Sequence, residues 1–190
     1  MKIWLTLLLG LGLNNIRLVD SQAFGTGNHG STRVALKAVE NTDFKNKKVL
    51  DIGTGTGILA IKAKLLGAKE IHCLDASGIS TKATKENFLL NSGNLDNIYI
   101  YTGFFKKVYE DNNLKDFDIV ISNILPDVHK YHLPNINKTL VPNGIAILSG
   151  MGDNEETDLI KPLQLNDFEI VERFIDDFWL SLKIQKQDDT

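Results

Sequence analysis

The stretch VLDIGTGTGI, residues 49–58, decides the expected fold because an apolar strand pattern changes here into a glycine-rich turn and then into a helix. Such a turn lets a ligand approach the backbone closely, beside the N-terminus of the helix. A second acidic residue, Asp75, ends the next apolar run 22 positions after Gly53. That spacing places a carboxylate where a ribose would present its hydroxyls. The sequence therefore predicts a ligand site at Gly53, Gly55 and Asp75.

The spacing of the glycines distinguishes two ligand classes. Dinucleotide-binding turns follow G-x-G-x-x-G, whereas the third glycine here, Gly57, comes one place early and Ile58 occupies the later position. Asp51, just before the turn, is also unusual for dinucleotide binding, and we expect it to stabilise the turn through backbone amides. The pattern D-x-G-x-G-x-G is typical of methyltransferases that use S-adenosyl-L-methionine. It favours that methyl donor, with dinucleotide binding and a non-catalytic domain as alternatives.

Outward from this turn, short apolar runs alternate with stretches of helical periodicity, as in βαβ units. Strands are predicted near residues 48–52, 70–75, 97–102, 117–122 and 144–149. Helices are predicted near residues 57–67, 79–92, 104–111, 127–138 and 155–164. Two alternating strands, 168–175 and 178–185, form a final hairpin. The expected fold class is α/β: a Rossmann-like class I methyltransferase with a mostly parallel seven-stranded sheet, a C-terminal antiparallel hairpin and helices on both faces.

Composition limits the setting and the partners of the chain. Its 190 residues suit one domain, and a net charge of −3 gives no general attraction to nucleic acid or to anionic membranes. Cys73 is the only cysteine, which rules out an internal disulfide and makes a reducing cytoplasm the simplest location. We therefore expect no direct nucleic-acid binding and no membrane association.

The N-terminal segment, residues 1–22, is apolar and lies outside the expected methyltransferase domain, residues 23–186. Its run at residues 3–13 resembles a signal-peptide core but is shorter than the ~20 residues of a membrane-spanning helix. A buried strand or a hydrophobic remnant is the alternative. Residues 187–190 are expected to be a polar tail.

The loop AFGTGNHGST, residues 23–32, almost matches the phosphate-binding pattern G-x-x-x-x-G-K-[ST], but Ser31 occupies the lysine position. Without that cation a triphosphate site is disfavoured. A glycine-rich turn that caps a helix is the stronger interpretation, because Ser31 and Thr32 are good N-cap residues and apolar residues then recur at helical spacing. His29 could titrate usefully in this loop, although a capping or packing role is favoured.

Asn123 follows the fourth strand in the segment SNILP, at the sheet edge where α/β proteins bind ligands. Methyltransferases that act on nitrogen often place an asparagine here, so Asn123 is the candidate catalytic residue; capping of the next helix is the alternative. His129 and His132 share a helical face without an evident third ligand, which indicates a surface pair and no metal site. Phe178 and Trp179 on the hairpin are interpreted mainly as packing residues, with a substrate pocket as the alternative.

Four segments together resemble the ribosomal protein L-eleven methyltransferase (PrmA) family over about residues 23–186: AFGTGNHGST, DIGTGTGILAIKAKLLGA, SNILPDV and VPNGIAILSGM. The family loop is close to AFGTG-x-H-x-T-T, from which this chain departs at Gly30 and Ser31. The resemblance implies an S-adenosyl-L-methionine-dependent methyltransferase for lysine and α-amino groups of a large-subunit ribosomal protein. It places donor contacts on Thr32, Gly53, Asp75 and Asn123. We also expect Phe24, Thr26 and Gly55 to contact the donor.

The resemblance also implies an additional N-terminal domain that recognises the ribosomal protein, whereas only about twenty residues precede the loop here. The alternatives are therefore a truncated domain that binds the donor but is inactive, and a methyltransferase with another amine substrate.

Overall fold

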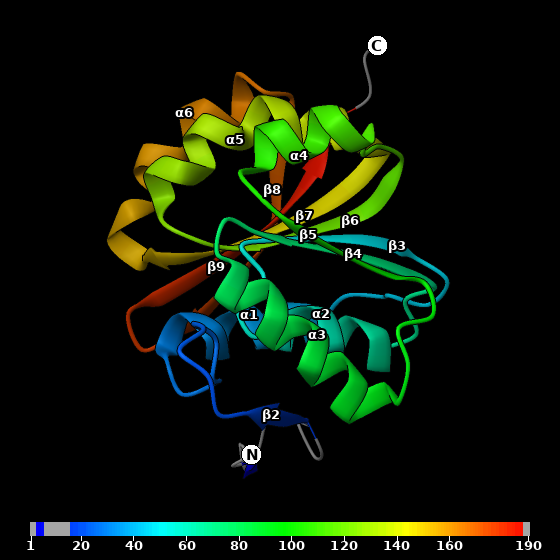
Figure 1. The fold of residues 1–190 in the computed structure, drawn as a ribbon. Coiled ribbons are helices and arrows are strands. Elements are labelled where there is room, and N and C mark those ends of the chain that lie inside the picture. Colours follow the sequence, from blue (N-terminus) through cyan, green and yellow to red (C-terminus); the bar gives the residue numbers. More distant parts are fainter. Residues whose placement is uncertain (1–2, 6–15, 188–190) are drawn as a thin grey trace.

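The computed structural model describes residues 3–5 and 16–187, and its centre is a seven-stranded sheet (Figure 1). The strands of this sheet are β3 (Lys48–Ile52), β4 (Glu70–Asp75), β5 (Ile98–Thr102), β6 (Phe117–Asn123), β7 (Leu140–Gly152), β8 (Phe168–Asp176) and β9 (Trp179–Lys186). They lie in the order β5-β4-β3-β6-β7-β9-β8, parallel from β5 to β7 and antiparallel across β9. The predicted parallel sheet and its antiparallel hairpin are confirmed, and β7 is longer than expected.

Helices cover both faces of the sheet, as predicted (Figure 1). On one face lie α1 (Gly30–Glu40), α2 (Ile58–Leu65) and α3 (Gly78–Ser92). On the other lie α4 (Phe105–Asn112), α5 (Pro126–Thr139) and α6 (Thr157–Gln164), with a short 3-10 turn at Asp153–Glu155 before α6. Because β3, β4 and β6 are parallel neighbours, their carboxyl ends and the segments that follow them meet at one edge.

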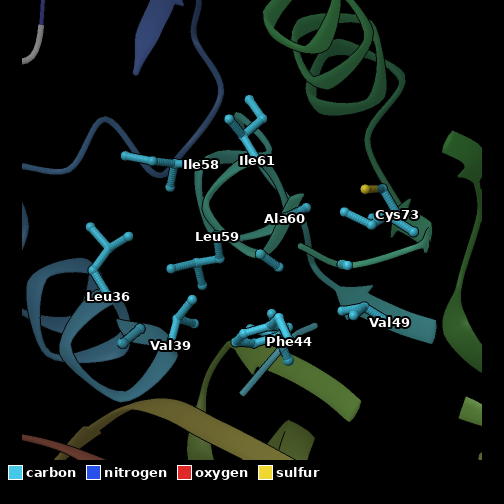
Figure 2. Close-up of a cluster of buried hydrophobic side chains, with 14 of the residues drawn as sticks. Leu36, Val39, Phe44, Val49, Ile58, Leu59, Ala60, Ile61 and Cys73 are labelled. Atoms are coloured by element: carbon cyan, nitrogen blue, oxygen red, sulfur yellow. The ribbon is translucent and has the colours of Figure 1, made fainter. Parts of the chain in front are cut away.

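Two apolar clusters, one on each face, hold the helices to the sheet. Figure 2 shows part of the first cluster, in which Leu36 and Val39 of α1 and Leu59 of α2 meet near Phe44. Cys73 of β4 lies in the same cluster and is fully buried, and burial raises the pKa of its thiol. The glycine turn, defined here as residues 53–57, is thus anchored on both sides by buried elements, β3 before it and α2 after it.

The N-terminal segment forms a separate two-stranded antiparallel ladder of β1 (Ile3–Leu5) and β2 (Arg17–Val19). The buried side chains of Ile16 and Leu18 join the first core cluster, and Asn87 of α3 accepts a hydrogen bond from the Val19 amide at 2.7 Å. Residues 3–5 thus form a strand, which is one of the alternatives for the apolar run; residues 6–13 of that run, and residues 188–190 of the tail, lie outside the described residues. Every helix in the described part of the chain is too short or too polar to cross a membrane.

Candidate active site

The glycine turn follows β3 directly and leaves no room for side chains at two positions. A Cβ atom added to Gly55 would lie 2.3 Å from the carbonyl oxygen of Phe24, and one added to Gly53 would lie 2.5 Å from Cγ2 of Ile124. Both glycines also have positive φ angles, +56° and +73°, which other residues adopt only with strain. The turn is therefore closely enclosed by the loop before α1 and by the segment after β6.

Asp75 ends β4 beside this turn, where the spacing predicted it. Its Oδ2 accepts a hydrogen bond from the Gly55 amide at 3.0 Å, and its Oδ1 accepts one from the Ser77 amide at 2.9 Å. The half-buried carboxylate keeps further lone pairs for a ligand, because each of its oxygens can accept more than one hydrogen bond. The structure thus brings Gly53, Gly55 and Asp75 together.

Asp51 lies beneath the glycine turn and is buried. Burial raises the pKa of its carboxyl to about 7, and the nearby charge of Asp75 adds to this effect. The Thr54 hydroxyl donates to Oδ2 of Asp51 at 2.7 Å, and the backbone of Ala60, in the first turn of α2, forms a second hydrogen bond. Asp51 therefore stabilises the turn, as predicted, but through a hydroxyl as well as a backbone amide.

The loop before α1 packs against the turn from the other side. The Phe24 carbonyl accepts a hydrogen bond from the Thr56 amide at 2.8 Å, and the Thr56 hydroxyl donates to the Gly25 carbonyl. His29 is the N-cap of α1 and accepts from the Ser31 amide through Nδ1 at 3.3 Å, which confirms its capping role. The prediction of Ser31 or Thr32 as the N-cap is wrong, because the helix already begins at Gly30. Thr26 is exposed in this loop.

Two buried side-chain oxygens, both on residues that the sequence pattern indicates, lack partners. Oγ1 of Thr32, in the first turn of α1, and Oδ1 of Asn123, at the end of β6, find no hydrogen-bond partner among the described residues. An unpaired buried acceptor or donor costs about 1–3 kcal/mol, so such a group needs a partner, which a bound ligand or an ordered water can supply.

Asn123 opens into a cavity of about 550 Å³, which we call the aromatic cavity. Its lining residues are Phe24, His29, Ser31, Asn123, Ile124, Leu125, Val128, Gly150 and Trp179. The rings of His29 and Trp179 meet edge to face with their centroids 4.7 Å apart, and the ring of Phe24 lies 5.3 Å from that of His29. The cavity therefore combines one amide side chain with three aromatic walls.

Trp179 lines this cavity, whereas the sequence favoured a packing role for it. Its neighbour Phe178 is 65% exposed. Trp179 also packs against the loop before α1: a Cβ atom added to Gly30 would lie 2.2 Å from Cδ1 of the indole. The absence of a side chain at Gly30 therefore makes room for Trp179.

The prediction that His129 and His132 form a surface pair is wrong. His129 is fully buried, and its Nε2 lies 2.8 Å from the Ser149 carbonyl oxygen. Burial lowers the pKa of His129 to about 4 and also lowers the pKa of the half-buried His132. The face that the two residues share packs inward because α5 lies against β7. Within residues 3–5 and 16–187, no group of three potential metal ligands comes together.

Comparisons with known proteins agree with this geometry. The family model described as ribosomal protein L11 methyltransferase (PrmA) matches residues 13–187. A protein of that name from Prochlorococcus marinus strain AS9601 is 43% identical over 92% of this chain and 57% of the relative. One from Fusobacterium nucleatum is 37% identical over 90% of this chain and 54% of the relative. The chain thus spans little more than half the length of these curated relatives.

Solved structures extend the comparison to the fold. The ribosomal protein L11 methylase from Lactobacillus delbrueckii superposes with a TM-score of 0.80 at 32% identity, covering 91% of this chain and 86% of that one. A precorrin methyltransferase from Geobacter metallireducens superposes with a TM-score of 0.68 at 15% identity, over 83% of this chain and 89% of that one, and shows the fold alone. The predicted class I methyltransferase fold is confirmed, and the chain belongs to the ribosomal protein L11 methyltransferase (PrmA) family.

Proposed function

We propose that residues 23–186 form an S-adenosyl-L-methionine-dependent methyltransferase domain that modifies lysine or α-amino groups of a large-subunit ribosomal protein in the cytoplasm. The observation that carries this proposal is the unpaired, buried Oδ1 of Asn123, a residue that lines the aromatic cavity. The names of the relatives support a ribosomal protein as the acceptor.

The residues around the turn fit a methyl donor. Its ribose and amino-acid portions carry several hydrogen-bonding groups, and the unpaired Thr32 and Asn123 oxygens would complete their own bonding on such a ligand. The residues proposed to hold the donor are Phe24, Thr26, Thr32, Gly53, Gly55, Asp75 and Asn123. When bound, the donor supplies a methyl group on a sulfonium for transfer in one in-line displacement.

The aromatic cavity suits an amine acceptor. A free lysine amine has a pKa near 10.4, so its neutral form costs about 4.6 kcal/mol at pH 7. Apolar walls disfavour the ammonium ion and lower that cost, while Oδ1 of Asn123 accepts an N–H and orients the nitrogen lone pair. His29 is the one titratable cavity-lining residue, and its Nδ1 is engaged in capping α1. The amine therefore loses its proton to water rather than to a dedicated base.

The test is methyl transfer to purified ribosomal protein L11 from labelled donor, read by mass spectrometry. We expect methyl groups on lysine or N-terminal amines, and a large loss of transfer in Asn123→Ala. Asn94→Ala, at an exposed position, is the control and should transfer at the parent rate. Transfer that persists unchanged in Asn123→Ala would refute the role of this residue.

A second candidate follows from the length of the chain relative to its family. Because the chain covers 57% of its relative from Prochlorococcus marinus, it could bind donor yet transfer nothing to the ribosomal protein. Donor binding by calorimetry without methyl incorporation would favour this candidate. Transfer to short lysine peptides but not to the ribosomal protein would instead indicate another amine substrate.

A further inference from the structure

Ser149 of β7 is fully buried where several walls of the aromatic cavity meet. Its carbonyl oxygen accepts two hydrogen bonds, one from the Ile124 amide at 3.2 Å and one from Nε2 of His129 at 2.8 Å. A carbonyl can only accept, so His129 carries its proton on Nε2. One backbone oxygen thereby fixes both the residue after Asn123 and the helix that follows it.

The side chain of Ser149 makes a further connection. Its hydroxyl oxygen lies 3.1 Å from the Ser31 carbonyl and 3.5 Å from the Leu180 carbonyl. A hydroxyl has a single proton, and the shorter distance assigns it to Ser31. Ser31 precedes Thr32, and Leu180 follows Trp179. Ser149 therefore contacts three of the segments that line the cavity.

The backbone at this point is irregular in a way that favours the contact. The pairing of β7 with β9 shifts register between Ser149 and Met151, which marks a β-bulge. Gly150, within the bulge, has φ +95°, and a Cβ atom added there would lie 2.3 Å from the carbonyl oxygen of Ile124. Bulges beside active sites commonly redirect neighbouring groups. Here the bulge brings the strand directly against the backbone that carries Asn123.

We infer that Ser149 is a positioning residue for the acceptor side of the site. Its carbonyl binds the Ile124 amide, next to Asn123, and its hydroxyl binds Ser31 of α1, so it fixes the position of Asn123 relative to α1. The expected effect on catalysis rests on the proposed function, because Asn123 is the residue proposed to orient the amine. His129 acts in the same network by fixing the Ser149 carbonyl. Removal of the hydroxyl breaks the link from β7 to the first turn of α1, while the Ser149 carbonyl keeps its bonds from Ile124 and His129.

Ser181 offers a matched control. It is also fully buried, pairs with Ser149 across the two strands, and donates its hydroxyl to the Leu148 carbonyl at 3.3 Å, which connects only β7 and β9. We expect Ser149→Ala to lower kcat for ribosomal protein L11 roughly tenfold relative to Ser181→Ala, since small misplacements of reacting groups are costly. Equal kcat values in the two variants would overturn the inference.

Amide hydrogen exchange gives a readout that needs no catalysis. Exchange in the first turn of α1, residues 31–35, should be faster in Ser149→Ala than in Ser181→Ala, and unchanged exchange would overturn the inference even in an inactive chain. His129→Gln keeps a donor for the Ser149 carbonyl and should retain more kcat than His129→Leu, which does not. Absence of methyl transfer by the parent chain, with the exchange difference present, would refute the proposed function while supporting the positioning role.

Discussion

The glycine turn and the aromatic cavity lie side by side but are built in opposite ways. The turn comes from one continuous stretch of chain, and α3 holds it from behind: Thr84 donates to the Gly55 carbonyl at 2.9 Å and Asn87 to the Thr56 carbonyl at 2.8 Å. The cavity is assembled from four separate segments, which meet around Ser149. A contiguous site can be recognised in the sequence, whereas an assembled site depends on the whole fold.

Each region also rests on one buried titratable group, and the two groups shift in opposite directions. Asp51 lies under the turn with a pKa raised to about 7, and His129 lies behind the cavity with a pKa lowered to about 4. Burial disfavours the charged form in both cases. Their contributions to stability should therefore change with pH in opposite senses, which allows the two regions to be tested separately.

The largest expected effect is that of Asp51. Its pKa rises from 3.8 to about 7 on folding, so the stability gained from the bound proton is complete below pH 3.8 and is lost as the pH rises to about 7. This shift corresponds to about 4 kcal/mol. Asp51→Asn removes the titrating carboxyl and with it the loss of stability at higher pH. The free energy of unfolding of this variant, relative to that of the parent, should therefore increase between pH 3.8 and about 7. Urea unfolding at a series of pH values measures this, and a difference that does not vary with pH would contradict it.

His129 should behave in the opposite way. Its pKa falls from 6.5 to about 4 on folding, so its stability contribution is complete above pH 6.5 and is lost as the pH falls to about 4. The shift corresponds to about 3 kcal/mol. Relative to His129→Gln, the parent should therefore lose stability on acidification through this window. The same unfolding series checks the sign, and an increase in relative stability on acidification would show that His129 is not buried as described.

Asp75 gives the next effect, on ligand affinity. Asp75→Ala removes a charged acceptor beside the turn, which should weaken binding of S-adenosyl-L-homocysteine by about 2 kcal/mol, or roughly 30-fold. Asp96→Ala, an acidic residue at an exposed position, serves as the control and should bind like the parent in calorimetry. Comparable losses in both variants would point to general electrostatics instead of a specific contact.

The smallest effect should come from the cavity wall. Trp179→Ala removes an aromatic surface from the acceptor side and should reduce kcat/KM for the ribosomal protein roughly fivefold, about 1 kcal/mol. Phe178→Ala changes an exposed neighbour and is the matched control. Steady-state kinetics measures both. A larger fall in donor affinity than in kcat/KM for Trp179→Ala would remove the distinction between the two regions.

The same contrast explains what could be predicted from the sequence. The strands, the hairpin and the position of Asp75 follow from local periodicity and from the glycine spacing, and all of them are confirmed. The spacing of His129 and His132 reveals that they share a helical face, but not that this face packs against β7. Trp179 reaches the cavity through a contact with Gly30, far away in the chain, which no local pattern encodes. Residues whose role depends on distant partners are therefore the ones that the sequence leaves open.

The most direct test of this account is a calorimetric titration of S-adenosyl-L-homocysteine into the parent chain, Asp75→Ala and Trp179→Ala. We predict one binding site in the parent, strong weakening in Asp75→Ala and an affinity within about twofold of the parent in Trp179→Ala. Absence of binding to the folded parent, or equal weakening in the two variants, would contradict the assignment of the glycine turn as the methyl-donor site.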